Sequence, residues 1–185
     1  AYGFFGVITF SRYPIIKADS IDYRNNETFN KGVYTDIKIG NDTVRIINIH
    51  LQSMSIRFKL QFNTIISQID TACFRLKKGF QMRSSQIDTV LSVAKRSPYP
   101  TIICGDFNEM PYSAIYQKTK QNFKNAFEES GNGFGFTCNR FPWLLRIDHQ
   151  FFSPDIDPIY CKTLSNSLSD HFPLEAGYVF RRRGG

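Results

Sequence analysis

The spacing of apolar residues changes along this chain, and that change most constrains its fold. Residues 32 to 49 alternate between apolar and polar on both sides of the turn residues 40 to 42, which predicts a β-hairpin. Apolar residues then recur every three or four positions, first from 58 to 76 and again from 87 to 94. This spacing predicts two amphipathic helices, separated at Gly79.

Further apolar runs complete a mixed pattern. Residues 4 to 10 and 101 to 104 are typical of buried strands, and strands are also predicted at 146 to 152, 156 to 163 and 172 to 180. Hairpins beside helical crossovers predict antiparallel sheet covered by helices. The 185 residues fit one domain. We therefore expect a layered sandwich of the α/β (α+β) class.

Charge and hydropathy indicate which partners are plausible. The composition, 42% hydrophobic and 21% charged, is that of a folded chain, and the net charge of +7 favours polyanions such as nucleic acid or an anionic membrane surface. The one dense basic cluster, Arg181-Arg182-Arg183, lies in residues 181–185, which we interpret as a solvated basic tail. No apolar run approaches the roughly 20 residues that span a bilayer. The segment is therefore predicted to be soluble, and its compartment is not defined.

Six polar side chains lie beside the ends of predicted strands: His50, Asp106, Asn108, Asp148, Asp170 and His171. The first three are at or just beyond strand ends, whereas the last three stand at strand starts. In sheets with antiparallel neighbours, these ends can share one edge. We therefore expect three carboxylates, two imidazoles and one amide to converge in a single cleft.

Such a cluster of carboxylates repels itself unless a cation compensates the charge. Carboxylate and amide oxygens favour hard ions, Mg²⁺ or Mn²⁺, and the absence of paired cysteine thiolates argues against zinc. These hard ions suit phosphoryl chemistry. The residues themselves therefore predict a metal-dependent phosphoester site.

Each motif also has a structural interpretation when it is taken alone. Residues 105 to 108 (GDFN) could form an ordinary turn, and residues 169 to 171 (SDH) could cap a helix or enter a strand. His50 could be a hydrogen-bonded structural histidine, and Asp148 could pair with Arg146. The occurrence of all four in this order favours the catalytic interpretation.

The order of motifs resembles the endonuclease/exonuclease/phosphatase superfamily, which includes deoxyribonucleases, apurinic/apyrimidinic endonucleases, neutral sphingomyelinases, inositol-polyphosphate phosphatases and deadenylases. The family-like segments are residues 6 to 15, 48 to 51 (NIHL), Arg83 with Gln86, 105 to 108, 146 to 149 (RIDH) and 169 to 173 (SDHFP). The resemblance implies a four-layered sandwich of two packed, mainly antiparallel mixed β-sheets flanked by helices.

The resemblance also implies a role for each motif residue. Asp106 would orient or deprotonate the attacking water, Asn108 would fix that water and a phosphate oxygen, and His50 would stabilise or protonate the leaving oxygen. Asp170 would ligate the metal. His171 would donate hydrogen bonds to the phosphate, with Asp148 holding its tautomer and charge. Weaker candidates for substrate contact are Tyr112, Trp143, Arg57, Arg75 and Arg146; for Trp143, core packing is an equal alternative.

The chain departs from the family pattern at its beginning. Family members open with a strand ending in Asn, then a helix, then a strand with the Glu that is the main metal ligand, and the sequence opens after that Glu. The resemblance therefore predicts that residues 1–180 are the C-terminal portion of one domain, lacking the first strand-helix-strand unit, with impaired turnover. The segment upstream of Ala1 could include a membrane anchor.

The motifs define the chemistry more closely than the substrate, because they act on the phosphate and not on what it carries. The leading prediction is a phosphodiesterase or nuclease that acts on a phosphoester substrate such as nucleic acid. The alternatives are a phospholipid or phosphoinositide head-group hydrolase, and a non-catalytic module that binds polyanions. No obligate protein partner is predicted, and we expect a monomer.

Overall fold

The computed structural model describes residues 6–23, 31–53, 65–140, 143–165 and 168–181. Its main sheet has six strands, in the spatial order β1 (Ile15–Ile21), β2 (Gly32–Ile39), β3 (Asp42–His50), β4 (Thr101–Asp106), β8 (Asp148–Phe152) and β5 (Lys124–Asn125). All neighbouring strands in this sheet are antiparallel except β3 and β4, which run parallel. A parallel pair needs a crossover, and the chain between β3 and β4 contains the long helix α1 (Ile65–Lys95).

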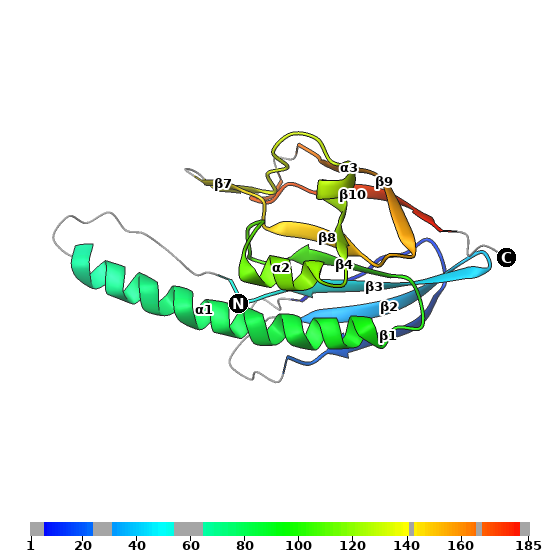
Figure 1. Cartoon of the computed structure of the whole chain (residues 1–185), viewed down its shortest axis with the longest axis horizontal. Helices are drawn as coiled ribbons and strands as arrows, with labels where there is room; N and C mark the ends of the chain where they lie inside the picture. Colours follow the sequence, from blue (N-terminus) through cyan, green and yellow to red (C-terminus); the bar gives the residue numbers. More distant parts are fainter. Residues whose placement is uncertain (1–5, 24–30, 54–64, 141–142, 166–167, 182–185) are drawn as a thin grey trace.

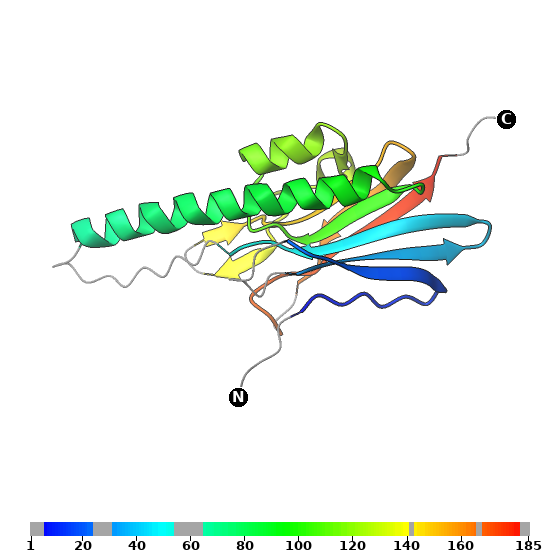
Figure 2. The ribbon, with the colours of Figure 1, turned by 90° about the horizontal axis from the view of Figure 1, so that it is seen from below.

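One face of the main sheet is covered by α1 and by α2 (Ala114–Lys120), which Figure 2 shows above the sheet. The core on this side contains Ile47, Ile103 and Phe151 of the sheet, packed with Val90 and Tyr116 of the helices. Among the described residues, no helix combines the length and the apolar character needed to cross a lipid bilayer.

The other face of the main sheet packs against a second sheet, formed by β9 (Ile156–Thr163) and β10 (Leu174–Phe180). The short helix α3 (Ala126–Ser130) joins the same core through Phe127. A hairpin of β6 (Cys138–Arg140) and β7 (Trp143–Leu145) extends to one side (Figure 1). This arrangement confirms the predicted mixed α/β fold of packed, mainly antiparallel sheets flanked by helices.

Several predicted elements are found where the pattern placed them. The hairpin from 32 to 49 is formed by β2 and β3, and its turn contains Gly40 at a φ of 60°. Residues 101 to 104 lie in β4, and the prediction for 156 to 163 coincides with β9. Strands β8 and β10 begin two residues later than predicted.

Two predictions were wrong, each because a local sequence pattern does not show which distant residues the segment will contact. Residues 6 to 10 of the expected strand at 4 to 10 are not in a strand, and residues 4 and 5 lie outside the described chain. A strand needs a neighbour for its backbone hydrogen bonds, and the apolar pattern cannot supply one. The helix is continuous through Gly79, where a side chain would come within 3.1 Å of the Arg83 guanidinium. Gly79 therefore permits a close approach and does not end the helix.

The central strand pairing brings three motif residues to one end of the main sheet. In the parallel pair, His50 of β3 lies opposite Asp106 of β4, and in the antiparallel pair Asp106 lies opposite Asp148 of β8. Residues 50, 106 and 148 therefore stand side by side on three adjacent strands.

Gly105 permits this pairing. Its φ is 131°, and a Cβ atom there would lie 2.0 Å from the Ile49 carbonyl oxygen. Both the backbone conformation and the space exclude any side chain. The residue before Asp106 must therefore be glycine for the strands to approach as they do.

We predict that Gly105→Ala lowers the free energy of unfolding by more than about 3 kcal/mol, because it combines backbone strain with a main-chain clash. Gly40→Ala has a φ of 60° but open space, so it should cost only about 1 kcal/mol. Gly6→Ala, with neither constraint, should cost less than about 0.5 kcal/mol. Urea unfolding of the three variants measures these differences, and a similar loss at Gly105 and Gly40 would contradict the prediction.

Candidate active site

Asp106 is the last residue of β4, and the turn that follows holds its carboxylate. The Oδ1 atom accepts a hydrogen bond from the backbone N–H of Asn108 at 2.7 Å. Asn108 has a positive φ of 50°, and its side-chain amide donates to the carbonyl oxygen of Leu51 at 3.1 Å. The turn therefore fixes Asp106 against the end of β3.

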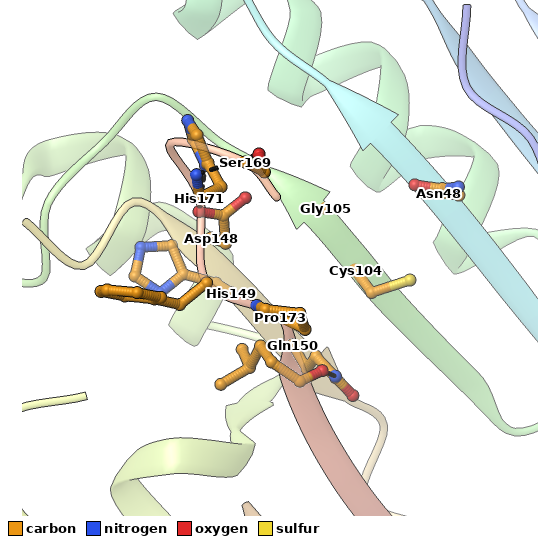
Figure 3. Close-up of a pocket in the computed structure, with 11 residues that line it drawn as sticks. Asn48, Cys104, Gly105, Asp148, His149, Gln150, Ser169, His171 and Pro173 are labelled. Carbon is orange, nitrogen blue, oxygen red and sulfur yellow. Dashed lines mark hydrogen bonds and ion pairs between the residues drawn. The ribbon is translucent and has the colours of Figure 1, made fainter. Parts of the chain in front are cut away.

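Asp148, the first residue of β8, pairs with His171, which lies just before β10. The distance between His171 Nδ1 and Asp148 Oδ2 is 2.8 Å, and Figure 3 shows the two side chains facing each other. This hydrogen bond raises the pKa of His171, because it stabilises the imidazolium. The bond occupies Nδ1 and leaves Nε2 on the opposite side of the ring as a donor.

Asp106, Asp148 and His171 form one compact group. Each offers a ligand atom, and these atoms all lie within 4.8 Å of one another. His50 joins them from β3, with its Nε2 atom 3.6 Å from Asp106 Oδ2. Four of the residues predicted from the sequence are thus brought together from three strands and one loop.

The group carries unbalanced negative charge around Asp106. Burial, together with the neighbouring Asp148 carboxylate, raises the pKa of Asp106 to about 6, against the lowering effects of the Asn108 hydrogen bond and of His171. Burial also lowers the pKa of His50, and the charge of His171 adds to this. His50 is therefore biased toward its neutral form while His171 is biased toward its charged form.

The donor set fits a hard divalent cation. Two carboxylates within 4.8 Å of each other, one of them with a raised pKa, are stabilised by a positive ion between them. Beside them is a cavity of about 430 Å³ whose lining includes Asp148, Ser169 and His171 (Figure 3). This space adjoins the group and can admit a phosphate.

Other candidates from the sequence lie outside this group. Asp170 is exposed, and its backbone carbonyl accepts a hydrogen bond from the N–H of Asn139 at 2.9 Å. The Arg146 guanidinium packs over the ring of Phe127, 4.6 Å from its centroid. Tyr112 is 79% exposed, in the loop after β4.

Three candidates from the sequence are not placed at the group. Arg75 is exposed on α1. Arg57 and the side chain of Trp143 lie outside the described part of the structure. The choice between core packing and substrate contact for Trp143 therefore stays open.

A buried polar network supports the site from behind, through residues of α1. The Arg83 guanidinium is 2.5 Å from Glu109 Oε1 and donates to the carbonyl of Gln52 at 3.0 Å. Gln86 Oε1 accepts from the N–H of Gln52 at 2.8 Å. This explains the family-like spacing of Arg83 and Gln86: both hold the segment that follows His50. The sequence motifs do not indicate Glu109, because its partner Arg83 is 26 residues away along the chain.

His149 differs from the other two histidines, although it adjoins Asp148. Its ring is buried against the aromatic rings of Phe107, Tyr116 and Phe151, and Nε2 bonds the carbonyl of Glu109 at 2.8 Å. Burial lowers its pKa to about 4. His149 is therefore a buried core residue that is biased toward its neutral form.

The chain belongs to the endonuclease/exonuclease/phosphatase family, because the family model of that description matches residues 1–171. This confirms the family predicted from the order of the motifs. No curated protein sequence matches the chain.

Solved structures share the fold at low sequence identity. An endonuclease/exonuclease/phosphatase from Bacteroides vulgatus has a TM-score of 0.67 and 15% identity, over 91% of this chain and 66% of that one. A mannosyl-6-phosphatase from Bacteroides thetaiotaomicron has a TM-score of 0.66 and 17% identity, over 91% of this chain and 67% of that one. D. rerio TDP2 complexed with a single strand DNA product has a TM-score of 0.64 and 16% identity, over 91% of this chain and 69% of that one. The chain spans about two thirds of the length of these structures.

Asp106 should destabilise the ion-free chain at high pH. Its folded-state pKa is raised from 3.8 to about 6, so stability falls as pH rises through this range and stays lower above it. Asp106→Asn removes the charge and keeps the acceptor for Asn108. We predict that it raises the free energy of unfolding by about 1–2 kcal/mol at about pH 8, a gain that shrinks as pH falls toward about 4.

Urea unfolding in the presence of a chelator measures this gain. The matched control is Asp36→Asn, because Asp36 is an aspartate that is more deeply buried than Asp106 but pairs with Arg45 at 2.7 Å. The control should lose stability under the same conditions, since the arginine is left without its partner. A loss at both positions would contradict the proposed charge imbalance at Asp106.

Proposed function

We propose that this protein hydrolyses phosphoester bonds, of the phosphodiester or nuclease type, by in-line attack of water with Mg²⁺ or Mn²⁺. The observation that carries the proposal is the convergence of Asp106, Asp148 and His171 within 4.8 Å, with His50 at 3.6 Å from Asp106. Family membership supports the same reaction class. The chemistry needs an oriented water, charge neutralisation at the phosphate and help for the leaving oxygen.

Asp106 is the proposed base. Its raised pKa of about 6 makes it a better proton acceptor than an ordinary aspartate while it is still ionised at neutral pH. Asn108 holds the carboxylate through its N–H at 2.7 Å and so orients the oxygen that faces the water. Its side-chain amide already donates to Leu51, which leaves the amide oxygen for the water.

His171 is the proposed electrostatic partner of the phosphate. Its Nδ1–H is held by Asp148 at 2.8 Å, so the Nε2–H can donate to a phosphate oxygen as negative charge builds. His50, on the neighbouring strand, is the proposed donor to the leaving oxygen. The two histidines therefore divide the work between the phosphate and the leaving group.

Asp170 would ligate the ion, and the neighbouring Asp106 and Asp148 carboxylates would attract it electrostatically while they keep their roles toward the water and His171. When bound, the ion would act as a Lewis acid on a phosphate oxygen. Hard oxygen donors favour Mg²⁺ or Mn²⁺ over zinc.

Of the predicted basic tail at residues 181–185, only Arg181 is described, and its guanidinium pairs with the Asp157 carboxylate at 2.6 Å. We also propose that residues 1–180 are the C-terminal portion of one domain. Three observations support this: the chain spans about two thirds of its structural neighbours, β10 pairs only with β9 among the described strands, and Ile8 and Phe10 are 66% and 85% exposed. An upstream strand-helix-strand unit would supply a further metal-binding carboxylate. The portion alone is then expected to have impaired turnover.

The relatives support a choice of substrates that carry a phosphoester. One neighbour is described as a mannosyl-6-phosphatase and another as complexed with single strand DNA product. The net charge of +7 favours nucleic acid over a sugar phosphate, because nucleic acid is a polyanion. We therefore propose a nucleic-acid phosphodiester as the first substrate to test.

We predict hydrolysis of bis(p-nitrophenyl) phosphate in the presence of Mn²⁺ or Mg²⁺, and none after chelation. Asp106→Ala and His171→Ala should each lower kcat by at least about 100-fold, because they remove the base and the phosphate donor. The charge-matched control Asp19→Ala, on exposed β1, should leave kcat unchanged. A natural chain extended upstream of Ala1 should be at least about tenfold faster.

Equal rates in the wild type and both site variants would refute the proposed function. Salt-sensitive binding of nucleic acid without cleavage, by this chain and by the extended one, would assign a binding module instead. Equal rates with and without the upstream extension would refute only the proposed division of the domain.

We predict that His50 matters more for a poor leaving group than for a good one. A nitrophenolate leaves without help, whereas the alkoxide of a dinucleotide must be stabilised or protonated, so His50→Ala should cost about tenfold more with the dinucleotide. His171→Ala is the matched control, because a group acting on the phosphate should affect both substrates alike. Equal losses for the two substrates in His50→Ala would place His50 elsewhere in the reaction.

A further inference from the structure

Thr137 is a fully buried polar residue that lies just before β6, beside the site. Its hydroxyl oxygen accepts two hydrogen bonds, from the N–H groups of Ile147 and Asp148, both at 3.0 Å. A single side chain therefore fixes the backbone at the start of β8. Asp148 owes its position to these bonds as well as to its strand.

The backbone of the same residue reaches the other half of the Asp148–His171 pair. The Thr137 carbonyl accepts from the N–H of Phe172 at 2.7 Å. The next residue, Cys138, forms an isolated β-bridge with His171. Thr137 is thus bonded on one side to the segment of Asp148 and on the other to the segment of His171.

This double attachment matters because Asp148 lies in the main sheet, whereas His171 lies in the loop that leads into the second sheet. Asp148 begins β8 in the main sheet, whereas His171 precedes β10 in the second sheet, 23 residues further along. Other links between the sheets lie farther along β8: the Gln150 amide donates to the Leu174 carbonyl at 2.8 Å, and the Tyr178 hydroxyl donates to the Gln150 side-chain oxygen at 2.9 Å. Thr137 is the link at the end where the two side chains meet.

We propose that Thr137 is a positioning residue for the reaction: it sets the separation of Asp148 and His171 by binding both segments at once. The inference rests on the proposed function, because it assigns Thr137 to that same site. Thr137 touches no reacting atom, and it acts through the hydrogen bond between Asp148 and His171. Small errors in the placement of such a pair are costly, because the donor must meet the charge that forms in the transition state.

The decisive variants are Thr137→Val, which replaces the hydroxyl with a methyl group, and Thr137→Ser, which keeps it. With bis(p-nitrophenyl) phosphate and Mn²⁺, Thr137→Val should lower kcat by about 10- to 100-fold, whereas Thr137→Ser should stay within about threefold of the wild type. Thr119→Val is the matched control. Thr119 is equally buried, but its hydroxyl donates to the Ile115 carbonyl within α2, away from the site.

A double-mutant cycle separates positioning from a general loss of stability. In an Asp148→Ala background, Thr137→Val should cause no further loss of kcat, because the residue that it positions is gone. An equal loss in both backgrounds would overturn the inference. So would a Thr137→Val rate within about threefold of the wild type, or an equal loss in Thr119→Val.

Amide hydrogen exchange tests the bridge without any turnover. The N–H groups of Ile147 and Asp148 should exchange faster in Thr137→Val, and at the wild-type rate in Thr137→Ser and Thr119→Val. Unchanged exchange in Thr137→Val would overturn the inference. A wild-type chain with no hydrolysis, alone or extended upstream, would instead refute the proposed function, and the exchange result would still decide whether Thr137 holds the two segments.

Discussion

The parallel pairing of β3 with β4 is the constraint on which the rest of the site depends. It sets His50 opposite Asp106, and the antiparallel neighbour β8 then adds Asp148 to the same end of the sheet. The pairing is possible because Gly105 has no side chain to meet the Ile49 carbonyl. One glycine therefore decides whether residues from three strands can share a cleft.

The site is assembled at a cost to stability. Asp106 is a largely buried carboxylate beside a second one, and Asn108 has a positive φ, which most non-glycine residues avoid although asparagine tolerates it. Two apolar cores, one on each face of the main sheet, offset this cost. A divalent cation would remove most of the repulsion, so binding and stability are coupled at this position.

Buried polar residues, and not loops alone, determine the geometry of the group. Arg83 of α1 holds Glu109 and Gln52, so the ends of β3 and β4 are tied to the helix that covers them. On the other side, Thr137 is bonded to Ile147, Asp148 and Phe172, where the two sheets meet. Hydrogen bonds in such dry surroundings are directional, which is why they can hold side chains to within a fraction of an ångström.

The sequence by itself determined the chemical types and the local elements: the hairpin of β2 and β3, strand β9, and His50, Asp106, Asp148 and His171 as neighbours at strand ends. Periodicity and motif order are properties of the sequence, so they can be recognised before the fold is known. The tertiary structure alone decided that α1 continues through Gly79, that residues 6 to 10 form no strand, and that Glu109 and Thr137 support the site. Each of these depends on contacts with residues that are distant in sequence. A buried polar residue cannot be recognised from the sequence pattern, because its role depends on a hydrogen-bond partner that only the fold brings near.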